Sequence, residues 1–422
     1  MTLSSAVSAD KQLFLPALGP HATVLAAMLR RFGYNAKLLE APCEETVEAG
    51  RAFTTTKEYF SLTALLGSVA RTLAKEEECL DKTVILIPAL EGAEVDGQYG
   101  RLLKSYLNKN GMTEVEVAAP FLEDLFSEKT PFGADLAAAL FRIIFAVDVL
   151  SEMLQEARAS ADDPVQANRL FAKYMRQLPA AQDIKAMVRA AAADFARLAI
   201  RPKNRPVIAL VGEPYLLYRP ELNANLVERA ERLGAQVKLA PLAEIVFHYL
   251  FEKQAEAKAK KELFGYLKYR AILSRLSAEA EQVILGAGTL LQLRAEKITC
   301  YSREHLACLY GRFGTYRIGK AMLAREEGAD AIINVASAYE NTALLTNIFS
   351  DRFKESGPWL NIGIDGRKNE NDEIRLQTFV HNLLQAKNVH GRSKKDSLTS
   401  NNAGCGGWRD DGEHLAGSSY GL

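Results

Sequence analysis

Glu213 is the carboxylate that the sequence places best for chemistry. It follows the apolar run "RPVIALVG" (205–212), which is typical of a buried strand. Open parallel sheets bind ligands at the carboxyl ends of their strands. Glu213 could therefore hold a ligand or a partner there, and it could equally cap the helix that follows.

Cysteines are the second group of residues that could take part in chemistry. Cys300 and Cys308 lie about two helical turns apart with His305 between them, so a metal or redox pair is conceivable. We favour the simpler interpretation, two small apolar residues on a buried helix face. The five cysteines are scattered and odd in number, which is typical of free thiols in a reducing, cytoplasmic compartment. They are Cys43, Cys79, Cys300, Cys308 and Cys405.

Charge and hydropathy exclude several classes of partner. Lys plus Arg and Asp plus Glu both number 52 among 422 residues, so no net field attracts nucleic acid or an acidic membrane. No apolar run approaches the roughly 20 residues that a membrane span needs. The first residues lack the basic and apolar regions of a secretory signal. The sequence also lacks a nucleotide-binding loop of the GxGxxG or GxxxxGK[ST] type.

Short apolar runs alternate with helical patterns, which predicts parallel βαβ units. We expect an α/β fold of two or three flavodoxin-like or Rossmann-like lobes with helical inserts. Residues 1–132 form the first lobe in this prediction and residues 133–200 a helical insert. Residues 201–388 form the second part, with a further helical insert near 245–295. The polar, Gly- and Ser-rich segment 389–422 is predicted to be disordered.

Several motifs resemble those of the 2-hydroxyacyl-CoA dehydratase and benzoyl-CoA reductase superfamily. The closest branch is the conserved region attached to BadF/BcrA-type acyl-CoA dehydratase activases. Its Gly-Arg-x-Tyr/Phe-Thr-x-x-Lys-Glu-Cys motif resembles the stretch from Gly50 to Tyr59, which includes Lys57 and Glu58. The other matching stretches are Gly92–Tyr99 (with Gly97 and Gln98), Gly212–Tyr215, Ile318–Val335 and Asn334–Thr342, and finally Trp359–Leu383.

This resemblance implies three loops that carry the cysteine ligands of an iron–sulfur cluster. The corresponding positions in this chain are Tyr59, Glu94 and Glu340, and no cysteine falls on them. Because thiolate is the usual ligand of such clusters, we expect no cluster in this chain. The phenol and the two carboxylates could hold a harder metal. We favour the alternative that both carboxylates lie in solvent or pair with Lys57 or Arg101.

The resemblance implies a function that depends on a partner. We expect a cluster-free, non-catalytic subunit of an ATP-driven dehydratase or reductase, with the iron–sulfur cluster in a related chain. The partner would be a second copy, a cluster-bearing relative or an ATP-hydrolysing activase. The alternative is an active enzyme of the acyl-CoA dehydratase or reductase type, with a non-standard or interface-shared metal cluster. If the chain is the non-catalytic subunit, the three loops should lie close together, facing an empty pocket or a neighbouring chain.

Overall fold

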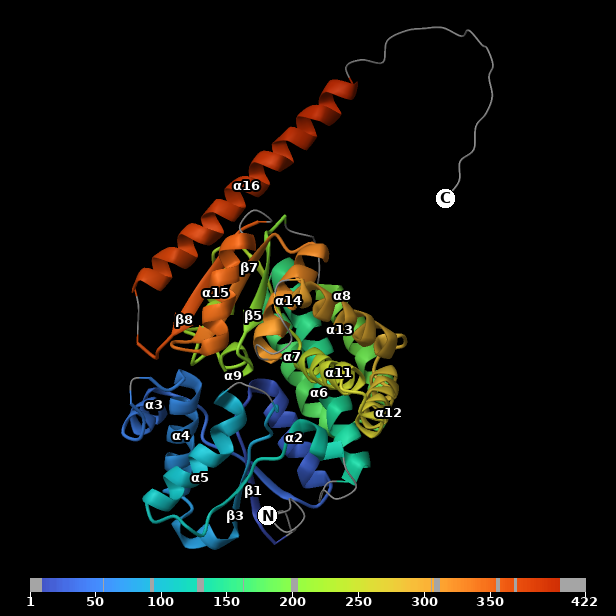
Figure 1. The fold of residues 1–422 in the computed structure, drawn as a ribbon. Coiled ribbons are helices and arrows are strands. Elements are labelled where there is room, and N and C mark those ends of the chain that lie inside the picture. Colours follow the sequence, from blue (N-terminus) through green and yellow to red (C-terminus); the bar gives the residue numbers. More distant parts are fainter. Residues whose placement is uncertain are drawn as a thin grey trace.

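Two parallel four-stranded sheets with helices around them form the framework of the chain (Figure 1). The structure is a computed structural model. It describes residues 10–55, 57–91, 95–126, 133–161, 163–198, 204–304, 306, 312–353, 357–367 and 370–402. The predicted α/β class with parallel-sheet lobes and helical inserts is confirmed.

The first lobe contains a sheet of order β2-β1-β3-β4. Its strands are β1 (Gln12–Leu15), β2 (Asn35–Leu38), β3 (Thr83–Leu86) and β4 (Glu116–Ala118). Its helices are α2 (Gly19–Arg31), α3 (Glu44–Arg51), α4 (Phe60–Leu73) and α5 (Tyr99–Lys109). All four residues of β3 are buried, as is typical of a central parallel strand covered on both faces.

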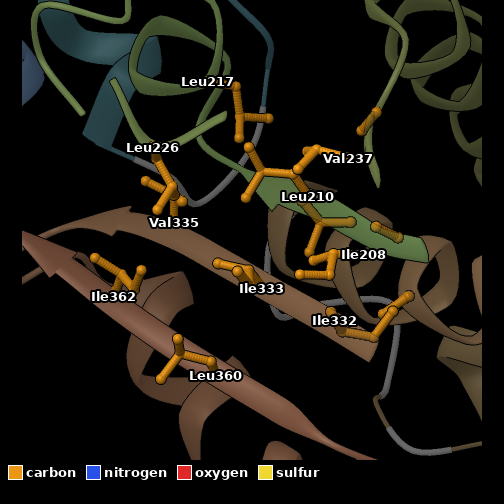
Figure 2. Packing of buried hydrophobic residues seen from close by; sticks show 14 of the residues in the cluster. Ile208, Leu210, Leu217, Leu226, Val237, Ile332, Ile333, Val335, Leu360 and Ile362 are labelled. Carbon is orange, nitrogen blue, oxygen red and sulfur yellow. The ribbon is translucent and has the colours of Figure 1, made fainter. Parts of the chain in front are cut away.

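The second lobe repeats this arrangement, with strand order β6-β5-β7-β8. Its strands are β5 (Val207–Gly212), β6 (Gln236–Leu239), β7 (Ala331–Ser337) and β8 (Trp359–Ile364). Its helices are α9 (Pro214–Leu217), α10 (Leu226–Arg232), α14 (Arg312–Glu326), α15 (Asn341–Phe353) and α16 (Glu370–Asn402). Figure 2 shows the core of this lobe, where aliphatic side chains of all four strands pack together with Leu217 and Leu226.

Helices fill the two segments for which the sequence predicts helical inserts. The first insert holds α6 (Gly133–Ser160), α7 (Pro164–Gln177) and α8 (Ile184–Leu198). The second holds α11 (Leu242–Ala259), α12 (Leu263–Glu281) and α13 (Ala287–Arg303). The two inserts pack against each other beside the lobes, with α6 contacting α11 and α12 (Figure 1).

The long helix α16 packs its first half on the second lobe, where Leu376, Val380 and Leu383 are buried. It continues to Asn402, so residues 389–402 of the segment predicted to be disordered are helical. Residues 403–422 lie outside the described part. None of the helices in the described residues is both long and apolar enough to cross a membrane.

Candidate functional site at the junction of the two lobes

The candidate site lies where the second sheet meets α4 and α5 of the first lobe. β5 and β7 are neighbours in that sheet, although they are far apart in sequence, so they form its switch point. Glu213 follows β5, and Ser337 ends β7. This is the edge at which open α/β sheets bind ligands. Here the first turn of α4 lies against it.

Ser61 of α4 joins the three loops through hydrogen bonds. Its backbone N–H donates to Ser337 Oγ (3.2 Å), and the two hydroxyl oxygens are 3.4 Å apart. The Ser61 hydroxyl also shares a hydrogen bond with the Tyr99 hydroxyl (3.0 Å). Tyr59 Oη accepts a hydrogen bond from the Asn341 N–H at the start of α15 (2.9 Å). The three predicted segments therefore lie together, packed against one another.

Two glycines set the position of α4. A Cβ atom on Gly67 would lie 1.6 Å from the carbonyl oxygen of Thr46, and one on Gly50 would lie 1.9 Å from that of Thr63. Only glycine permits so close an approach of two backbones. The "GRAFTTTKEYFSLTALLG" segment thus folds α3 tightly onto α4, and this contact directs the first turn of α4 towards the second sheet.

Glu340 is held inside the junction by the protein itself. Its carboxylate forms an ion pair with Arg317 of α14, and both side chains are almost fully buried, with 4% and 0% of their surface exposed. It also accepts hydrogen bonds from the Thr342 hydroxyl (2.5 Å) and the Ser337 N–H (3.1 Å). The expectation that Glu340 lies in solvent, or pairs with Lys57 or Arg101, is wrong. A carboxylate without water requires a partner, and a buried arginine supplies it.

Glu213 is the second carboxylate of the junction. Its Oε2 accepts a hydrogen bond from the Ser337 hydroxyl (2.7 Å). Burial, together with the negative charge of Glu340, raises the pKa of Glu213 to about 7. A carboxyl with this pKa can bind or release a proton near neutral pH.

The close approach of β5 and β7 explains why the residue before Glu213 is a glycine, Gly212. A Cβ atom on Gly212 would lie 2.0 Å from the carbonyl oxygen of Val335 on β7. The Gly-Glu pair therefore lets the two central strands approach closely where the polar groups meet.

Other residues singled out in the sequence lie away from this cluster. Lys57 and Gln98 are exposed, while the Glu58 carboxylate bonds the Thr55 hydroxyl (2.7 Å). Asn334 is buried inside the sheet and donates to Asn361 on β8 (3.2 Å), so it ties strands together. Gly97 lies in the turn before α5, where a Cβ atom would be 2.9 Å from the Leu90 carbonyl oxygen. Glu94 lies outside the described residues.

The sequence analysis missed three members of the cluster. Ser61 lies two residues after Tyr59, and Ser337 lies at the end of a predicted strand. These positions were a weak signal that the two serines belong to the site. Arg317 lies on α14, far from every motif loop in the sequence. The same helix also carries Arg312, Lys320 and Arg325, so nothing in the sequence set Arg317 apart from them.

The junction does not fit a cysteine-ligated cluster. Tyr59 and Glu340 are engaged in hydrogen bonds and an ion pair, and neither is a thiolate. Within the described ranges, no three His, Cys, Asp or Glu side chains gather as metal ligands would.

The described cysteines lie outside the junction. Cys43 precedes α3 and is partly buried. Cys300 is exposed on α13, so its predicted place on a buried helix face is wrong. The buried face of α13 is formed instead by small and aliphatic residues such as Ala295 and Ile298. Cys308 and His305 lie outside the described residues.

Comparison with known proteins gives no family for this chain. No protein-family model matches the sequence, and no curated protein matches it. The resemblance to the dehydratase and reductase superfamily therefore rests on the motifs alone.

Proposed function

We propose that this chain is a cluster-free, non-catalytic subunit of an ATP-driven dehydratase- or reductase-type iron–sulfur system, located in the cytoplasm. It pairs with a related chain that carries the cluster, or with an ATP-hydrolysing activase. The observation that supports this proposal is the closed junction. Two of the three positions at which the resemblance places cluster ligands, Tyr59 and Glu340, bind other protein groups instead.

The surface beside the junction supports pairing with another chain. Tyr339 is 71% exposed and has a left-handed backbone (φ 66°), which is strained for a bulky residue. Leu344 and Ile348, one turn apart on α15, are 63% and 56% exposed. Apolar side chains that gather on a surface favour a protein interface.

The alternative function is an active dehydratase or reductase that holds a non-standard metal cluster, alone or across an interface. Glu94 and Glu340, together with Tyr59, would then be the oxygen ligands. The raised pKa of Glu213 gives this alternative its specific support, because catalytic carboxyls often titrate near neutral pH.

Anoxic purification of the tagged chain from its own cells tests the proposal. Iron and acid-labile sulfide are measured per chain, on the isolated chain and on any complex, and partners are identified by mass spectrometry. We expect iron and sulfide only in complexes that contain a related chain with cysteines at the positions of Tyr59, Glu94 and Glu340. Stoichiometric iron and sulfide on the isolated chain would contradict the proposal and favour the alternative.

A paired substitution tests the docking surface. We expect Leu344→Glu with Ile348→Glu to abolish the complex while the chain remains folded. Ile374→Glu is the matched control, since Ile374 is 59% exposed on α16. An intact complex with the paired variant would place the interface elsewhere.

A further inference from the structure

A cavity of about 1200 Å³ lies between the first helical insert and the second sheet. One wall is a face of the sheet, formed by Val207, Ala209 and Val211 of β5 and by Lys238 of β6. The other walls come from α6 and α7 of the insert and from α13 and α14. Sites for small molecules typically measure roughly 300–1,000 Å³. The space is therefore large enough for an organic ligand.

Aliphatic and aromatic side chains form much of the lining. They include Phe145, Val149, Leu154, Phe171, Leu285 and Leu290. Such a lining gains free energy when an apolar molecule displaces water from it. The main part of a suitable ligand is therefore apolar.

Most charged groups that line the cavity already have protein partners. Arg158 pairs with Glu231, and Arg294 bridges Glu244 and Glu327. Asp148 accepts hydrogen bonds from backbone N–H groups at the start of α11, and Lys320 pairs with Glu244. The remaining partnered cations are Arg205, with the Glu231 carbonyl oxygen, Arg219, with Glu221, and Arg232, with Glu228.

Lys238 is the exception among the cations of this lining. Within the described residues, no carboxylate lies within 4.0 Å of its amine. Glu152, the other charge without a partner, lies exposed at the rim. Lys238 is half-buried in the middle of β6, opposite Ala209 in the ladder. The next residue, Leu239, donates its N–H to Gln155 of α6 (3.1 Å), so the strand is fixed against the insert.

An ammonium group held partly away from water attracts an anion, since pairing offsets the loss of hydration. We propose that the cavity binds an amphipathic organic anion. Its apolar body lies against the insert helices, and its carboxylate pairs with Lys238. This inference stands apart from the proposed function, because the cavity and the junction have separate linings.

Isothermal titration calorimetry of the full chain with decanoate tests the inference. Decan-1-ol is the control that has the same alkyl chain but no charge. Acetate is the control that has the carboxylate but no long alkyl chain. We expect decanoate to bind with one site and acetate to show no binding. Lys238→Gln should weaken decanoate binding roughly tenfold or more and leave decan-1-ol binding unchanged. Lys109→Gln, at an exposed position of α5, is the matched control and should change neither.

Two further variants keep the test decisive. Lys238→Arg retains the charge and should bind decanoate within a few fold of the natural chain. Val165→Trp, at a half-exposed position of the lining, should weaken decanoate and decan-1-ol alike. Absence of decanoate binding to the natural chain, or equal binding by Lys238→Gln, would overturn the inference. Circular dichroism verifies that each variant is folded.

Discussion

The junction between the lobes and the cavity beside the insert differ in how their charged side chains are paired. In the junction, Glu340 faces Arg317, and Glu213 faces the Ser337 hydroxyl. In the cavity, the half-buried Lys238 has no carboxylate within 4.0 Å of its amine among the described residues. The ion pair of the junction is complete without a ligand, whereas we propose that the charge of Lys238 is paired by one. The motif loops thus form a structural contact at the junction. The group proposed to bind a ligand, Lys238, lies on β6, which matches none of the motifs.

The largest effect is expected from breaking the ion pair of the junction. Glu340→Gln removes the carboxylate that pairs with the buried Arg317, and this should lower the free energy of unfolding by roughly 3–5 kcal/mol. Urea titration followed by circular dichroism measures it. Glu114→Gln, on the exposed surface, is the control and should change the value by less than about 0.5 kcal/mol. Equal effects of both substitutions would show that the junction is open to water.

An intermediate effect is expected from pH. The pKa of Glu213 is about 7 in the folded chain and 4.5 in an ordinary environment, so the folded state binds the proton more tightly. The stabilisation is complete below about pH 4.5 and is lost as the pH rises towards 7, by up to about 3 kcal/mol. Unfolding free energies between pH 5 and 8 should therefore fall more steeply for the natural chain than for Glu213→Gln. Parallel curves would contradict the assignment.

A smaller effect is expected at the hydroxyl that joins the loops. Ser61→Ala removes hydrogen bonds to Tyr99 and Ser337, which should lower the free energy of unfolding by about 1–2 kcal/mol. Ser105→Ala, at an exposed position of α5, should have no measurable effect. If Ser61→Ala changed the free energy of unfolding as little as this control, the Ser61 hydroxyl would not stabilise the contact between the loops.

Local sequence signals predicted the framework well. The run "VIALVG" is apolar throughout, and "AIINVAS" is apolar except for Asn334 and Ser337. This pattern indicates strands covered on both faces, as β5 and β7 are. Gly33 and Gly111 follow helices and have positive φ, which is typical of the glycines that end helices. Such features depend on neighbouring residues, so one sequence is enough to infer them.

The environment of the site residues could not be predicted in this way. Glu340 was expected in solvent or paired with Lys57 or Arg101. Its partner Arg317 instead comes from a helix that packs on β7 and α15. Cys300 was expected on a buried face but is exposed. Which face α13 buries is determined by its packing against α11 and α14. The cavity around Lys238 depends on three separate segments. These features arise from tertiary packing, which periodicity does not record.

A double-mutant cycle on Arg317 and Glu340 tests the closed junction most directly. The free energies of unfolding of Arg317→Met, Glu340→Gln and the double variant are compared with that of the natural chain. We predict a coupling energy of roughly 2 kcal/mol or more, because the two groups satisfy each other away from water. Additive effects, with a coupling below about 0.5 kcal/mol, would contradict the closed junction and leave Glu340 available to a ligand or metal.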